Sequence, residues 1–192
     1  MTATQAHVRP SPDAAFQRQL ERDAVWSRMI SPGARIPDLP VVEADLGPVF
    51  LHRLLDTGPL VLIFFRHAGS GACEAALTAY DRGLAGTDAH VVAVSPQRPD
   101  LLAGLKRRRE LRLLVAADPR HTLIDRFGIG FAAPEAVEAL GTGRSVLPYP
   151  AVVVAGRDGV VRFADVSPDP AARTAPSAIL AAVAEAEARA VR

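Results

Sequence analysis

Residues 60–65 form an uninterrupted apolar run, Leu-Val-Leu-Ile-Phe-Phe. A strand without polar alternation is typical of a sheet that is covered on both faces. Residues 90–94 and 113–116 have the same character, and a segment with a helical pattern follows each run. Alternating strands and helices predict a central parallel sheet between two layers of helices. We therefore expect an α/β protein.

The later part of the chain adds antiparallel strands. Residues 151–155 and 160–163 are rich in β-branched residues and flank Asp158-Gly159, a strong hairpin signal. A final helix is expected near residues 177–190. The sheet is therefore predicted to be mixed, and a βαβ half followed by ββα resembles the thioredoxin-like arrangement.

The sequence predicts that the chain has three parts: a tail, a helical extension and a folded domain. Residues 1–12 contain two prolines and few apolar residues, which favours a disordered tail. Residues 13–32 are expected to be a helical extension, and residues 33–192 the thioredoxin-like domain. Apolar residues at helical spacing must be buried on this domain or on a second copy of the chain. They are Phe16, Leu20, Ala24, Val25 and Met29, with Trp26 beside them.

Composition argues against several classes of protein. The chain has 22 basic and 21 acidic residues, a balance unlike that of proteins that bind nucleic acid or acidic membranes. No apolar run reaches the ~18 residues of a membrane span, and the first residues lack the apolar segment of a secretory signal. Cys73 is the only cysteine, which excludes an intrachain disulfide and fits a reducing, cytoplasmic compartment. We expect no metal and no other cofactor.

Residues 66–73 are the candidate site, because ligand sites in open α/β sheets lie beyond the carboxyl ends of strands. Ser70 is expected to be the N-cap of the next helix, with its hydroxyl accepting the Cys73 N–H. Cys73 would then lie in the first turn, where the helix dipole favours a thiolate. Arg66 or His67 could add positive charge, whereas Glu74 would oppose it if it faced the sulfur. The alternative is that Cys73 is a small, inert core residue.

The segment Ser70-Gly71-Ala72-Cys73 resembles the T/S-x-x-C motif of peroxiredoxins of the AhpC/TSA type. Other motifs of that family follow in the same order over about residues 13–185. They are Gly33 with Pro37-Asp38, Val94-Ser95-Pro96, Asp118-Pro119, Phe127-Gly128, Leu147-Pro148-Tyr149-Pro150-Ala151 and Asp158-Gly159. The resemblance implies a thioredoxin-like fold, a central mixed β-sheet flanked by helices, here with an extra N-terminal helix.

Several positions depart from the family pattern. Arg66 stands where the family has Pro, Ala76 where it often has Glu, and Pro150 where an Arg normally adjoins the thiolate. In thioredoxin folds the proline that matches Pro150 is cis and faces the active cysteine. Tyr149 beside it would line the pocket or simply pack in the core.

Ser70 also stands where a related branch has the first cysteine of C-x-x-C, so one chain cannot use a dithiol mechanism. A one-cysteine mechanism would need Arg66, Arg144 or another Arg as a replacement for the missing one. The resemblance further implies that the Asp169–Arg173 stretch forms a structural ion pair. The basic stretch Lys106–Arg109 is expected to be a solvated helix face.

The function implied by the resemblance is a thiol-dependent peroxidase. Cys73 would attack a small-molecule peroxide and become a sulfenic acid, which an external thiol would reduce. The alternative is a redox-inactive thioredoxin-fold protein recruited to small-molecule binding or to a different reaction in a biosynthetic pathway. Relatives commonly form dimers, so we expect a homodimer with the N-terminal helix at its interface.

Overall fold

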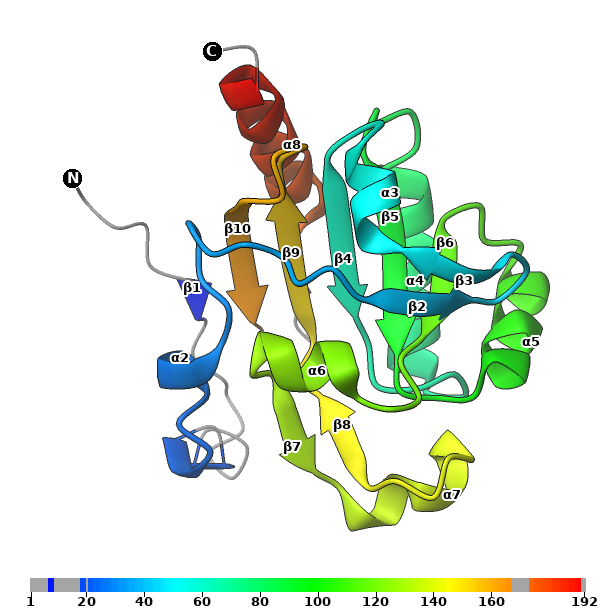
Figure 1. Ribbon diagram of the computed structural model, residues 1–192. Coiled ribbons are helices and arrows are strands. Elements are labelled where there is room, and N and C mark those ends of the chain that lie inside the picture. Colours follow the sequence, from blue (N-terminus) through cyan, green and yellow to red (C-terminus); the bar gives the residue numbers. More distant parts are fainter. Residues whose placement is uncertain (1–6, 9–17, 20, 167–172, 191–192) are drawn as a thin grey trace.

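The structure is a computed structural model that describes residues 7–8, 18–19, 21–166 and 173–190 (Figure 1). Within these residues the chain forms an eight-stranded mixed sheet. Its strands lie in the order β1 (His7–Val8), β10 (Val161–Val166), β9 (Ala151–Ala155), β4 (Leu60–Phe64), β5 (His90–Ser95), β6 (Leu114–Ala117), β2 (Pro40–Glu43) and β3 (Gly47–Phe50).

The pairing of the strands has the predicted mixed character. β4, β5 and β6 are parallel neighbours. β9 runs antiparallel between β4 and β10, and β2 runs antiparallel to both β6 and β3. The α/β class and the mixed sheet flanked by helices are therefore confirmed, including the hairpin around Asp158-Gly159.

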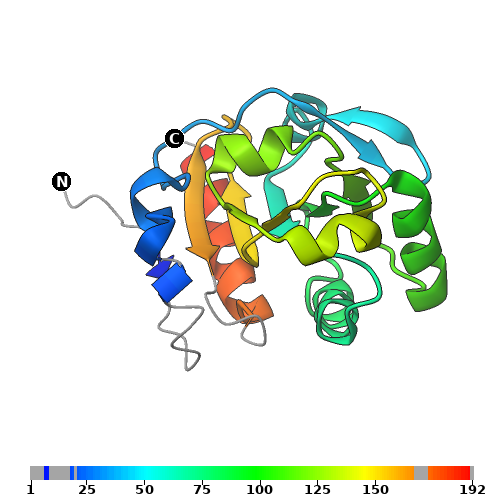
Figure 2. The same ribbon diagram turned by 90° about the horizontal axis from the view of Figure 1, so that it is seen from below.

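Helices cover both faces of this sheet, as Figures 1 and 2 show. α4 (Gly71–Gly83), α5 (Pro99–Arg109) and α8 (Pro176–Ala190) pack on the face to which Val61 and Ile63 of β4 point. α3 (Leu51–Leu55) and α6 (Thr122–Phe127) pack on the opposite face, with Leu60, Leu62 and Phe64. No helix in the described ranges is long and apolar enough to cross a membrane.

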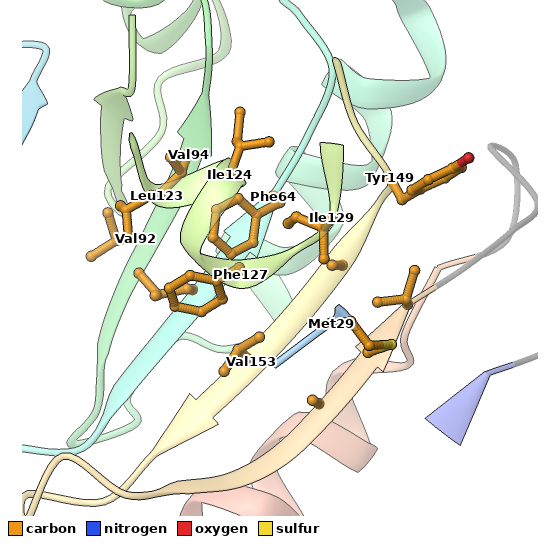
Figure 3. Close-up of a cluster of buried hydrophobic side chains, with 14 of the residues drawn as sticks. Met29, Phe64, Val92, Val94, Leu123, Ile124, Phe127, Ile129, Tyr149 and Val153 are labelled. Atoms are coloured by element: carbon orange, nitrogen blue, oxygen red, sulfur yellow. The ribbon is translucent and has the colours of Figure 1, made fainter. Parts of the chain in front are cut away.

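Figure 3 shows the second of these layers, in which the rings of Phe64 and Phe127 lie 5.1 Å apart. The ring of Tyr149 points away from this pair. Each strand residue of β4 is buried because the sheet has a helical layer on either side. This double coverage explains the uninterrupted apolar run in the sequence.

Residues 130–147 contain more regular structure than the sequence predicts. They contain a short 3₁₀ turn, η1 (Pro134–Ala136), followed by α7 (Val137–Leu140). On either side, β7 (Gly130–Ala132) and β8 (Val146–Pro148) pair as an antiparallel two-stranded sheet. Three-residue strands carry too little periodicity to be recognised in a sequence.

The N-terminal segment differs from the predicted continuous helix. Residues 18–19 and 21–22 are helical, and α2 (Val25–Arg28) follows only after Ala24, whose φ is +48°. Val25 and Met29 are buried in the same core layer as Phe64 and Phe127. The described part of this segment therefore folds back on its own domain, whereas Phe16 and Leu20 lie outside the described residues.

Close backbone contacts fix this segment. The Ile30 N–H donates to the Phe127 carbonyl at 2.9 Å, and the Arg28 guanidinium donates to the Gly130 carbonyl at 2.6 Å. Gly128 has a positive φ, and any side chain there would collide with the Arg28 carbonyl.

Farther upstream, β1 pairs in parallel with β10, so His7 and Val8 are a strand rather than part of a tail. The rest of residues 1–12 lies outside the described part.

Candidate functional site

Cys73 is the third residue of α4, in the first turn after the loop that leaves β4. Its side chain is 2% exposed and packs with Leu77 and Tyr80 of the same helix. Ser70 occupies the N-cap position as predicted, but its hydroxyl makes no capping hydrogen bond. The expected bond from the Cys73 N–H to this hydroxyl was therefore wrong; the Ser70 carbonyl accepts the Glu74 N–H instead.

Arg173 lies next to the Cys73 sulfur, with its Nη2 atom 4.0 Å from Sγ. It comes from the segment just before α8, a hundred residues along the chain from Cys73. The sequence resemblance suggested only a structural ion pair for this arginine, within a stretch that begins at Asp169. Asp169 lies outside the described residues. The sequence does not predict that Arg173 approaches the thiol, because the two residues meet only through the packing of α8 beside α4.

Arg66 contributes a second guanidinium to the same region. Burial lowers its pKa from the ordinary value, while attraction to Cys73 acts in the opposite direction and repulsion from Arg173 lowers it further. The guanidinium carbon lies 5.6 Å from the centre of the Phe131 ring. Cys73 and Arg173 thus both act electrostatically on Arg66, which places the two arginines, from distant parts of the sequence, near one sulfur.

Three side chains hold the backbone of the loop between β4 and α4. The Ser95 hydroxyl donates to the Arg66 carbonyl at 3.0 Å. The Ala68 N–H donates to Gln97 Oε1 at 2.6 Å, and the buried Gln97 amide in turn donates to the Ala139 carbonyl at 2.7 Å. Sequence reasoning missed Gln97, because a lone glutamine after a strand carries no recognisable motif.

Glu74 is the third of these side chains, and its carboxylate is bound by the loop and by α5. The Gly69 N–H donates to its Oε1 at 3.0 Å, and Arg109 donates to Oε2 at 2.7 Å, with Arg108 at 3.2 Å from Oε1. The hydrogen bond from Gly69, with those of the two guanidinium groups, lowers the pKa of Glu74 although burial opposes them. Glu74 therefore clamps α4, its entry loop and α5 together.

The basic stretch of α5 is exposed at residues 107–109, as its sequence predicts, but it also forms ion pairs that the sequence does not reveal. Lys106 pairs with Glu43 and Asp45, each at 2.7 Å, while Arg108 and Arg109 pair with Glu74. The carboxylates that neutralise the stretch come from distant segments, which a local charge count cannot reveal.

A narrow pocket of about 10 Å³ adjoins Cys73. Pro150, Arg173 and Thr174 line it together with Tyr80 and apolar residues of β4 and β9. Pro150 therefore lies at the cysteine, as the resemblance implied. Its peptide bond is trans, however, because the described chain contains no cis peptide, so the expected cis proline was wrong. Trans is the ordinary state of an X-Pro bond.

His67 and Tyr149 do not line this pocket. The His67 Nδ1 atom lies 2.9 Å from the neighbouring Ala68 carbonyl. Tyr149 is fully buried, and its hydroxyl donates to the Asp23 carboxylate at 2.8 Å. Burial and this carboxylate raise the pKa of Tyr149. No cluster of metal-ligating side chains forms within the described ranges.

Solved structures resemble this fold along most of their length. Peroxidoxin BcpB from Mycobacterium tuberculosis matches with a TM-score of 0.65 and 21% identity, over 82% of this chain and 96% of that one. A peroxiredoxin-like protein from Aquifex aeolicus matches with a TM-score of 0.68 and 20% identity, over 82% and 88%. A yeast mitochondrial 1-Cys peroxiredoxin, studied for its thiol resolving mechanism via the glutathione and thioredoxin systems, matches with a TM-score of 0.61 and 12% identity, over 79% of this chain and 74% of that one.

At these identities the structural matches establish the fold alone, and no curated protein sequence matches the chain. The family assignment comes from a sequence profile. The profile of the AhpC/TSA family matches residues 32–164, more than half of the chain, and spans both the S-x-x-C segment and the hairpin. The chain belongs to the AhpC/TSA family.

Proposed function

We propose that this protein is a one-cysteine, thiol-dependent peroxidase. The observation that carries the proposal is the 4.0 Å approach of the Arg173 guanidinium to a sulfur in the first turn of a helix. Such a site must keep the thiolate ionised, polarise the O–O bond and stabilise the departing oxygen. The first turn of α4 favours the anion, and Arg173 supplies a positive charge where the family's usual Arg is replaced by Pro150.

The proposed reaction is a two-electron oxidation of Cys73. The thiolate attacks one peroxide oxygen, an S–O bond forms, and the O–O bond breaks. The other oxygen leaves with the electron pair as hydroxide or alkoxide and takes a proton to become water or an alcohol. Two equivalents of an external thiol then return the sulfenic acid to the thiol and release one disulfide and one water.

An external thiol is required because Cys73 has no partner cysteine in the chain. In the yeast 1-Cys peroxiredoxin the thiol is resolved via glutathione and thioredoxin systems. A thiol of that class is the proposed reductant here. We place the protein in the cytoplasm, since a reducing compartment supplies such thiols.

Steady-state peroxide consumption with a thiol reductant tests the proposal. We expect Cys73→Ser to lose all protein-dependent consumption of hydrogen peroxide. Arg173→Gln should slow it by about a hundred-fold or more, the usual cost of removing one charge-stabilising donor. Arg53→Gln serves as the matched control, because Arg53 is an exposed arginine of α3 on the other face of the sheet. Equal rates for wild type and Cys73→Ser would refute the peroxidase.

One observation favours the redox-inactive alternative. Cys73 is almost completely buried and its pocket has room for little more than a water molecule. The pH dependence of iodoacetamide alkylation separates the two functions. A midpoint well below the ~8.5 of a free thiol supports the peroxidase, and a midpoint at or above it supports the alternative.

A further inference from the structure

We infer that Thr174 and Asp165 act as positioning residues that hold Arg173 against the Cys73 sulfur. The inference rests on the proposed function, in which Arg173 stabilises the thiolate. It concerns the adjacent residue Thr174 and a carboxylate on β10, for which the family pattern gives no role.

The contact between these two residues is short and buried. The Thr174 hydroxyl donates to Asp165 Oδ2 at 2.8 Å. Their exposed fractions are 4% and 2%. A hydrogen bond to a buried carboxylate is worth more than one between neutral groups, because the charged acceptor is costly to leave without donors. Thr174 is therefore pinned to the sheet.

The pinned backbone is docked on a second side by the helix that carries Cys73. A Cβ atom added to Gly83, near the end of α4, would lie 2.8 Å from Pro176 side-chain atoms. Glycine thus permits close packing of the start of α8 on α4. Thr174 and Pro176 fix the chain at two points immediately after Arg173, one on β10 and one on α4.

This double anchoring matters because arginine has a long, flexible side chain. Fixing a side chain of this kind costs up to about 2 kcal/mol of conformational entropy. The Thr174 bond fixes the position from which the guanidinium extends, so less freedom remains to be lost at the sulfur. Thr174 also lines the cysteine pocket, which places the anchor beside the reacting group.

The test is a double-mutant cycle on the full chain, read as the midpoint of the pH profile of Cys73 alkylation by iodoacetamide. Arg173→Gln should raise this midpoint by about one to three units, the effect of losing an opposite charge at this distance. Thr174→Val, which removes only the hydroxyl from a side chain of the same shape, should raise it by more than ~0.5 unit. Thr174→Ser, which keeps the hydroxyl, should restore the wild-type midpoint.

The decisive arm adds Thr174→Val to Arg173→Gln. If Thr174 acts through Arg173, the second change adds no further shift. An equal shift with and without Arg173 overturns the inference, as does a wild-type midpoint for Thr174→Val. In both cases the proposed function stands, provided that Arg173→Gln itself raises the midpoint. If Arg173→Gln leaves the midpoint unchanged, the electrostatic role in the proposed function fails and the inference fails with it.

Thermal unfolding of each variant serves as the folding control. Should Thr174→Val not fold, Thr174→Ala replaces it in the cycle, because the smaller side chain leaves room for a water to donate to Asp165. The same outcomes then apply to the alanine variant.

Discussion

Two guanidinium groups lie near the Cys73 sulfur, and different observations relate each of them to it. Arg173 approaches Sγ to 4.0 Å. Arg66 interacts electrostatically with Cys73 while its guanidinium lies over the Phe131 ring. Electrostatic stabilisation of a reacting group depends strongly on how directly the charge faces it. We therefore assign the larger role to Arg173.

This ranking predicts unequal effects of two matched substitutions. Arg66→Gln should slow the second-order reaction with hydrogen peroxide by at most about ten-fold, while Arg173→Gln slows it by about a hundred-fold or more. Rapid-mixing measurements at pH 7 on both variants and on wild type give the three rates. A greater loss in Arg66→Gln than in Arg173→Gln would reverse the assignment.

At the scale of elements, Glu74 joins the entry loop, α4 and α5. Its carboxylate is almost buried, whereas Arg108 and Arg109 are about half exposed, so solvent weakens these ion pairs. The hydrogen bond from Gly69 is the leading reason that the pKa of Glu74 is lowered from its ordinary 4.5. Because the pKa of Glu74 is lower in the folded state than in the unfolded state, the carboxylate stabilises the fold at pH values above its unfolded-state pKa. This stabilisation is lost as the pH falls through the folded-state pKa.

Glu74→Gln should therefore destabilise the protein by about 1 kcal/mol at pH 7. The difference from wild type should shrink as the pH falls below 4.5, because protonated Glu74 then resembles Gln. Urea unfolding at pH 7 and near pH 3 measures both differences. Glu138→Gln on α7, an exposed position, is the control. A difference that stays constant between the two pH values contradicts the clamping role of the Glu74 carboxylate.

The N-terminal segment is a second element-scale case. The Met29 side chain is 6% exposed and lies in the core, whereas the Trp26 side chain on α2 is 39% exposed. Met29→Ala should cost about 2–4 kcal/mol of unfolding free energy, as deletions from a packed core do. Trp26→Ala should cost about 0.5 kcal/mol or less in a monomer. Similar small losses from both changes would show that this segment does not pack on its own domain in solution.

These elements differ in how well the sequence predicts them. The strands at residues 60–65 and 90–94 are recognisable because burial on both faces leaves a continuous apolar run. The break in the helix at Ala24 cannot be recognised in the sequence. Tertiary packing of Val25 and Met29 stabilises a left-handed backbone conformation that alanine alone disfavours. Cys73 follows from its local motif. Its neighbour Arg173 does not, because only the packing of α8 on α4 brings the two together.

At the scale of the whole molecule, the sheet separates the cysteine site from the N-terminal segment. Cys73 and Ile179 of α8 belong to one core layer, while Val25 and Met29 belong to the other. The division into an N-terminal extension and a domain that begins at residue 33 remains a proposal, whereas His7 and Val8 belong to the sheet.

Assembly is also a property of the whole molecule, and we propose a homodimer that uses the N-terminal segment. Trp26 is an exposed aromatic residue in the described part of that segment, and the formal net charge of +1 offers little repulsion between copies. We expect sedimentation velocity at micromolar concentration to give a dimer for the full chain and a monomer for Trp26→Ser. A monomeric full chain ends the proposal. A dimeric Trp26→Ser variant keeps the dimer but removes Trp26 from its interface.

The most direct test of the proposed peroxidase is the reaction of Cys73 with hydrogen peroxide in the absence of any reductant. Dimedone added during the reaction traps a sulfenic acid, and intact-protein mass spectrometry counts the adducts over time. We expect a single adduct on Cys73, formed at least about a hundred-fold faster than on free cysteine when both are compared per thiolate. A rate equal to that of free cysteine, or the absence of the adduct, would contradict the peroxidase.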